Sequence, residues 1–140
     1  MILICYARRD KTRGRLSCLN HSENGSVNGI LTTVTVMDVI YILRKHMTSA
    51  RVRSAVQLIM QIADVVPVLK SDINAALISN FPDTEDAVQA ICAARVKAEY
   101  IVTRNVNDFK DSTVPAIMPT DMLALLSPKI GEEEPVERGS

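Results

Sequence analysis

The sequence has 140 residues, the length of one ordinary domain, and its formal net charge is zero. Apolar residues make up 47% of it and charged residues 23%, which is typical of a soluble globular protein. The neutral balance gives no sign of a general nucleic-acid-binding protein, and no apolar run is long enough to form a membrane helix.

Signals for strands and helices alternate along the chain, after an apolar start and a basic run over residues 8–15. The patterns predict strands over residues 27–31, 65–69, 100–103 and 116–118. Helical periodicity predicts helices over residues 35–47, 50–63, 71–79 (capped by Ser71) and 83–98, with a last short helix capped by Thr120. This alternation predicts an α/β fold with a central, mostly parallel sheet and helices on both faces. We expect one domain over residues 1–126 and a disordered tail over 127–140.

Pro67 falls inside one predicted strand, which must therefore lie near an edge of the sheet. The cysteines Cys5, Cys18 and Cys92 have no paired spacing, which argues against a disulfide scaffold or a zinc site and favours a reducing compartment. The apolar start lacks the basic region of a secretory signal. We therefore expect a cytoplasmic protein.

The stretch from residue 81 to residue 109 carries the clearest functional signal. Asp83 is a good N-cap, and Asp86 follows it at the spacing of a capping box. For Asp83 and Glu85, a purely structural role at the helix N-terminus explains the acidic residues as well as a functional role does. Asp86 lies beside an apolar stripe and should face inward, where a carboxylate needs a partner.

A polar turn follows the predicted strand over residues 100–103. It contains Thr103 and Asn105, with Asp108 just beyond. Open α/β sheets bind ligands at the carboxyl ends of their strands, so this turn is a candidate site. A simpler interpretation is that Asn105 is a turn residue that tolerates a left-handed conformation and that Asp108 caps the turn near Phe109.

A third acid, Asp38, lies in an otherwise apolar helix with the sequence Val-Met-Asp-Val-Ile. Its simplest explanation is a capping box that begins at Thr35. The functional alternative is that Asp38, Asp86 and Asp108 form one carboxylate site.

Together these segments resemble the second half of a PIN domain, over about residues 28–126. The resemblance is carried by the segments Thr84-Glu85-Asp86-Ala87-Val88-Gln89-Ala90, Tyr100-Ile101-Val102-Thr103-Arg104-Asn105 and Asp108-Phe109, and by the upstream stretch from Gly29 to Lys45. It implies a three-layer α/β/α fold and a metal-dependent endoribonuclease, the toxin of a bacterial toxin–antitoxin pair. It also implies that Asp38, Asp86 and Asp108 are catalytic metal ligands supported by Thr103 and Asn105.

The implied cofactor is Mg²⁺ or Mn²⁺, because both prefer oxygen ligands. Crowded carboxylates repel each other unless a cation neutralises them, and the cation can then activate a water. The resemblance further implies an RNA substrate, a homodimer and a cognate antitoxin that covers the site.

The sequence departs from the PIN pattern at its beginning. A PIN domain normally opens with a hydrophobic strand that ends in Asp-Thr-Asn or a close variant, and no such motif occurs here. Either the start is truncated or the first catalytic acid is lacking, and the apolar segment 1–6 could fill the vacant strand position. The alternative function is therefore an impaired PIN-like domain that binds RNA or an antitoxin. A generic nucleotide-binding protein is a third possibility, weakened by the absence of a glycine-rich phosphate loop.

Several basic residues could guide an RNA backbone. Arg44, Lys45 and Arg104 are the first candidates, with Arg51 and Arg53 beside them, although an ordinary solvated helix face explains most of these charges. There is no Trp and only 4% aromatic content, so base stacking is a poor explanation. Contacts with RNA should therefore be made to phosphates and should be sensitive to salt. We expect His21 and His46 to be surface residues.

Overall fold

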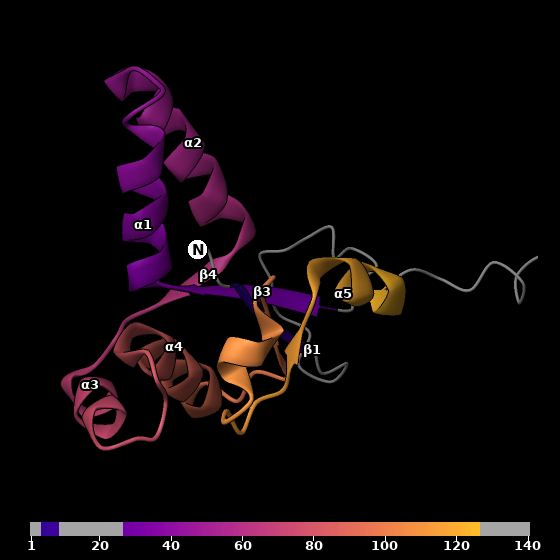
Figure 1. Cartoon of the computed structure of the whole chain (residues 1–140). Helices are drawn as coiled ribbons and strands as arrows, with labels where there is room; N and C mark the ends of the chain where they lie inside the picture. The colour runs from indigo at the N-terminus through magenta and orange to yellow at the C-terminus, as the bar shows by residue number, and fades with distance from the viewer. Residues whose placement is uncertain (1–3, 9–26, 127–140) are drawn as a thin grey trace, which may run out of the picture.

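A computed structural model describes residues 4–8 and 27–126, and the predictions for residues 9–26 and 127–140 lie outside them. Five strands form one sheet in the order β4-β3-β1-β5-β6 (Figure 1). Their bounds are Ile4–Arg8 (β1), Val27–Thr32 (β3), Asp64–Val66 (β4), Tyr100–Val102 (β5) and Ala116–Ile117 (β6).

Four of the five strands run in the same direction, which confirms the mostly parallel sheet. β3 pairs in parallel with β4, and β5 pairs in parallel with β6. β1 lies between β3 and β5 and runs antiparallel to both, with Ile4 opposite Val102 and Cys5 opposite Ile30. The apolar N-terminal segment therefore fills the central position, with its first described residue at the edge where the other strands end.

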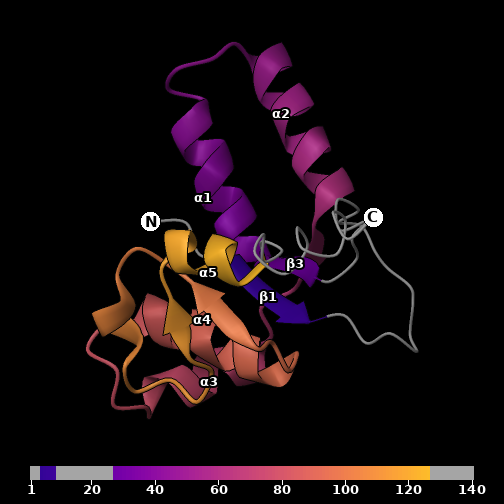
Figure 2. The same ribbon diagram turned by 90° about the vertical axis from the view of Figure 1, so that its right-hand side faces the viewer.

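Helices cover both sides of this sheet. On one side, α1 (Thr33–Leu43) and α2 (Ser49–Ile62) form a hairpin that projects away from the strands. On the other side lie α3 (Lys70–Leu77) and α4 (Thr84–Arg95), as the second view also shows (Figures 1 and 2). The short 3₁₀ helix η1 (Val106–Phe109) follows β5, and α5 (Pro119–Leu126) follows β6. None of the helices in the described part of the chain could span a membrane.

The cap of α1 differs from the prediction. Thr32, the last residue of β3, has extended backbone angles, and its hydroxyl oxygen accepts the N–H of Thr35 at 3.2 Å. Because the strand ends directly in this cap, the helix begins at Thr33 rather than Thr35. Thr35 is inside the first turn, and Asp38 is one turn further on. The proposed capping box from Thr35 to Asp38 is therefore wrong.

Other predicted boundaries have mixed outcomes. Asp83 caps α4 as predicted, accepting the Asp86 N–H at 2.9 Å. Ser71 does not cap α3, because the Asp72 carboxylate binds the N–H of Leu69 at 2.8 Å and starts the helix earlier. Thr120 lies inside α5, which begins at Pro119. Pro67 follows β4, which is an edge strand as predicted.

The inner face of α4 is formed by small residues, which lets the helix lie close to the sheet. Ala90 and Ala93 pack with Ile101 of β5 and with Phe109, and all four side chains are buried.

The carboxyl-terminal end of α4 is held by an ion pair between the exposed Arg95 and the buried Asp72. Arg95 Nη2 lies 3.0 Å from a carboxylate oxygen of Asp72, whose residue is 2% exposed, and it also donates to the carbonyl oxygen of Pro67 at 2.6 Å. Burial opposes ionisation of Asp72, but the bonds from Arg95 and the Leu69 N–H outweigh it and lower the pKa of Asp72. Burial and the neighbouring Asp72 raise the pKa of the Cys92 thiol to about 11.

Candidate active site

Two of the three predicted acids follow strands at the carboxyl edge of the sheet. Asp38 lies on α1, which starts where β3 ends, and Asp108 lies in η1, just beyond β5. Asp86 is in the first turn of α4. Asp38 and Asp86 are partly buried, whereas Asp108 is exposed.

The structure brings Asp86 and Asp108 into electrostatic contact. Burial raises the pKa of Asp86 most strongly, and the negative charges of Asp83, Asp108 and Glu85 raise it further. Ionised Asp86 therefore lies in a partly desolvated, acidic environment, where a cation would be stabilising. Asp38 is not among the leading influences on the pKa of Asp86.

Two aromatic rings position Asp108. Its neighbour Phe109 is 2% exposed and meets Phe81 edge to face, with ring centroids 6.4 Å apart. Phe81 immediately precedes the turn that starts α4, so this contact holds η1 beside the first turn of that helix. The proximity of Asp108 to Asp86 is thus a consequence of core packing.

Thr103 and Asn105 shape the turn that leads to η1. The buried hydroxyl of Thr103 accepts the N–H of Asn105 at 3.0 Å, and the Thr103 N–H donates to the carbonyl of Ile117 at 3.0 Å. Asn105 has a φ of −110°, so the explanation that it supplies a left-handed turn residue is wrong. Asn105 occupies the cap position of η1, whereas Asp108 lies within the helix.

The sequence reasoning missed a buried polar cluster between α1 and α4. Thr32 donates to the Gln89 side-chain oxygen at 2.9 Å, and the Gln89 side-chain nitrogen donates to the Thr35 hydroxyl at 3.2 Å. The only sequence signal for this cluster was Gln89, a polar residue among the small, buried residues of α4.

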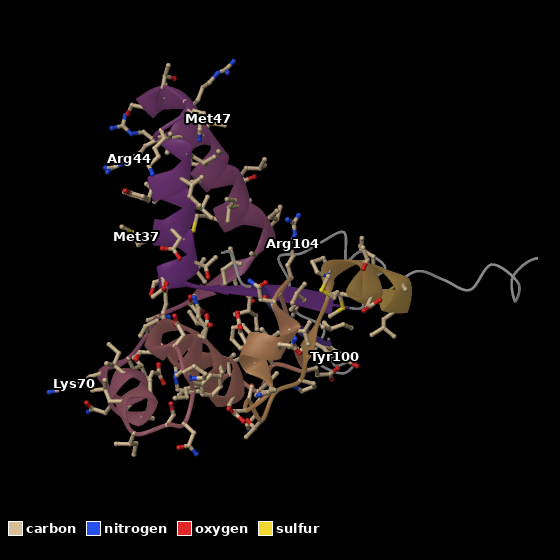
Figure 3. The ribbon with its side chains drawn as sticks, in the orientation of Figure 1. Met37, Arg44, Met47, Lys70, Tyr100 and Arg104 are labelled. Carbon is tan, nitrogen blue, oxygen red and sulfur yellow. The ribbon has the colours of Figure 1, made fainter. Side chains whose placement is uncertain are left out.

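A polar pocket of about 590 Å³ opens beside Asp108. It is lined by Arg104, Asn105, Asn107 and Asp108, and by Asp121 of α5. Asp121 was also missed, although it lies just beyond a predicted strand, as Asp108 does. Figure 3 shows Arg104 close to the sheet, far from Arg44 and Met47 on the hairpin.

Arg44 and Lys45 lie apart from the acids. Both are exposed and lie against the ring of Tyr41, at 4.8 and 4.4 Å from its centroid. Arg44 is six positions beyond Asp38, roughly 9 Å further along the helix axis. Any contact of these two residues with RNA therefore requires a substrate that extends along the hairpin.

Asp108 lines this pocket, and its charge acts on the nearby carboxylate of Asp86. Carboxylates are preferred ligands of Mg²⁺, and the repulsion that raises the pKa of Asp86 is what a bound cation would relieve. Within residues 4–8 and 27–126, no group of three or more His, Cys, Asp or Glu side chains is close enough to hold a metal. The predicted set of three acids is thus represented by the interacting pair Asp86 and Asp108, with Asp38 on the neighbouring helix.

The mostly parallel sheet, its helices and the acids beyond its strand ends define an α/β protein with a nuclease-type fold. Residues 1–107 match the PIN domain family, and the chain belongs to that family. PIN domains are generally nucleases and typically use a divalent metal. No curated protein and no solved structure matches the chain significantly.

Proposed function

We propose that the chain is a Mg²⁺- or Mn²⁺-dependent endoribonuclease. Asp86 and Asp108 would hold the ion, and Asp38 would approach it from α1. The observation that carries this proposal is the packing of Phe109 against Phe81, which places Asp108 beside the first turn of α4, where its charge acts on Asp86. Two neighbouring carboxylates repel each other, which destabilises the folded protein. A cation bound between them would relieve this repulsion.

When bound, the ion would activate a water and stabilise the charge that develops on a phosphodiester. The chain's own residues would prepare the site. Thr103 and Asn105 fix the turn before η1, and Phe109 anchors Asp108 beside α4. The polar pocket next to Asp108 offers Arg104 to a substrate phosphate.

The low aromatic content leaves few rings for base stacking, so contacts with RNA should be made mainly to phosphates. RNA binding should therefore weaken as the salt concentration rises. Arg104 would act near the acids, whereas Arg44 and Lys45 would contact more distant phosphates of a longer RNA. RNA in this role is a cytoplasmic substrate, so the proposal places the chain in the cytoplasm.

The test is cleavage of a mixed RNA substrate with Mg²⁺ or Mn²⁺, compared with EDTA. Asp86→Asn should lower the rate at least about 100-fold, since even the loss of groups that only support metal ligands can lower activity that much. Asp111→Asn is the matched control, because Asp111 is exposed and lies in the loop after η1. Equal rates for Asp86→Asn and Asp111→Asn would contradict the proposal.

A second function is favoured by β1. This strand occupies the central position, where the family places an acid, yet its sequence Ile-Cys-Tyr-Ala-Arg contains no carboxylate. The alternative is a PIN-like module that binds RNA or an antitoxin without cleaving RNA. Salt-sensitive RNA binding without metal-dependent cleavage would support this alternative.

We also propose the toxin role, with a homodimer and a cognate antitoxin as partners. Apolar side chains exposed on the hairpin, among them Met37, Tyr41 and Leu58, support a protein partner because such surfaces are usually covered. Light scattering of the purified chain would test the dimer. Rescue of growth by the product of a neighbouring gene would test the antitoxin.

A further inference from the structure

We propose that Gln89 is a positioning residue that ties the start of α1 to the middle of α4 and so fixes the orientation of Asp38 relative to Asp86. This inference rests on the proposed metal-dependent function. It assigns a role to the Thr32–Gln89–Thr35 cluster, whose members are themselves too deeply buried to contact RNA.

The cluster joins the start of α1 to the middle of α4. Thr32, Thr35 and Gln89 are 2%, 1% and 4% exposed. The Gln89 amide uses both of its ends, accepting from Thr32 at 2.9 Å and donating to Thr35 at 3.2 Å. The two threonine hydroxyl oxygens lie 3.3 Å apart, and the Thr35 N–H donates to Thr32.

The spacing places each acid one turn from this connection. Asp38 follows Thr35 by three positions on α1, and Asp86 precedes Gln89 by three positions on α4. Residues three apart lie on the same face of a helix, roughly 4.5 Å apart along its axis. The helix faces that carry the two acids are therefore the faces that the cluster holds together.

Hydrogen bonds suit this role better than apolar packing. An apolar contact tolerates sliding and rotation, whereas an amide held at both ends fixes the rotation of each helix. The arrangement is also demanding, since a buried polar group without a partner costs about 1–3 kcal/mol. A chain that needed only a stable core at this point would be served equally well by an apolar residue of the same volume.

The opposite end of α4 provides a control for stability. Arg95 binds Asp72 at that end, six positions beyond Gln89. Removing Arg95 should destabilise the fold, since it leaves the Asp72 carboxylate buried without its cation. It should leave the connection between α1 and α4 intact.

The experiment measures Mn²⁺ affinity by electron paramagnetic resonance of the free ion, using Thr35→Val, Thr35→Ser and Arg95→Met. Thr35→Val removes the hydroxyl and keeps the shape, and it should weaken Mn²⁺ binding about 10-fold. Thr35→Ser keeps the hydroxyl and should bind like the unchanged protein. Arg95→Met should lower the melting temperature without a comparable loss of affinity.

Gln89→Met, which keeps the volume of the side chain, replaces Thr35→Val if that variant does not fold. Unchanged Mn²⁺ affinity in the folded variant would overturn the positioning role and leave the proposed function standing. Equal losses in Arg95→Met would show a general effect of stability and would also overturn it. If the unchanged protein and Asp86→Asn both fail to bind Mn²⁺, the proposed function fails, and the positioning role fails with it.

Discussion

Asp86 experiences opposing electrostatic influences in the first turn of α4. The helix dipole favours a negative charge there, whereas burial and the charges of Asp83, Asp108 and Glu85 oppose it. The raised pKa of Asp86 shows that the opposing influences are stronger. The ionised form of Asp86 therefore weakens the metal-free fold.

Asp86→Asn should consequently stabilise the metal-free protein near pH 7, by no more than about 1 kcal/mol because water screens a partly exposed group. A carboxyl group with a raised pKa binds protons more tightly in the folded state. Its destabilising effect is absent well below its ordinary pKa of 3.8 and grows as the pH rises through the folded-state value. Urea unfolding at pH 3 and pH 7 measures the difference. A variant less stable than the parent at pH 7 would contradict the account.

Some residue-scale features were predictable because they are local. The cap at Asp83 and the inward position of Asp86 follow from spacing along one helix. The pairing of Asp72 with Arg95 and the cluster around Gln89 were not predicted, since their partners lie on separate elements. Asp38 could be identified as a candidate, but its distance from the other acids depends on how two helices pack.

At the scale of elements, η1 carries an acid of the site on a single turn anchored by Phe109. Phe109→Ala should destabilise the protein by about 3–5 kcal/mol, because it leaves a cavity against Ala90, Ala93 and Ile101. Phe109→Leu keeps most of the volume and should cost less than about 1.5 kcal/mol. Denaturant unfolding compares the two variants, and equal small losses would show that η1 is held by other contacts.

The boundaries of elements were predicted less well than their existence. The start of α1 was misplaced because Thr32 ends β3 and caps the helix at once, so no loop residue marks the change. The end of α4 also lacks its usual sequence signal. Lys97 takes a left-handed φ of 58°, a conformation for which glycine is the usual sequence signal.

For the whole molecule, the central antiparallel β1 holds the two parallel halves of the sheet together. In β1, Tyr6 is paired with Gly29 of β3 on one side and with Tyr100 of β5 on the other. Tyr6→Pro should therefore destabilise the fold by about 3 kcal/mol or more, because proline removes a backbone donor from a central strand. Tyr6→Val is the control, since valine keeps the donor and favours strands. A similar melting temperature for both variants would show that β1 is dispensable.

The direction of β1 could not be predicted from the sequence. Apolar alternation has the same period in either direction, so the segment could be identified as a strand for the vacant position but not oriented. Its orientation matters to the site, because β1 begins at the edge where β3 and β5 end. The family pattern alone would have placed an acid at this edge from a strand running the other way.

The most direct test of the coupled pair is the pKa of the Asp86 carboxyl, followed by carbon-13 NMR during a pH titration. Without metal, the pKa should lie above its ordinary value, and Asp108→Asn should lower it. Saturating Mg²⁺ should lower it further in the parent protein, because a bound cation favours the ionised form. A pKa that is unaffected by both Asp108→Asn and Mg²⁺ would contradict the claim that these two acids form a cation site.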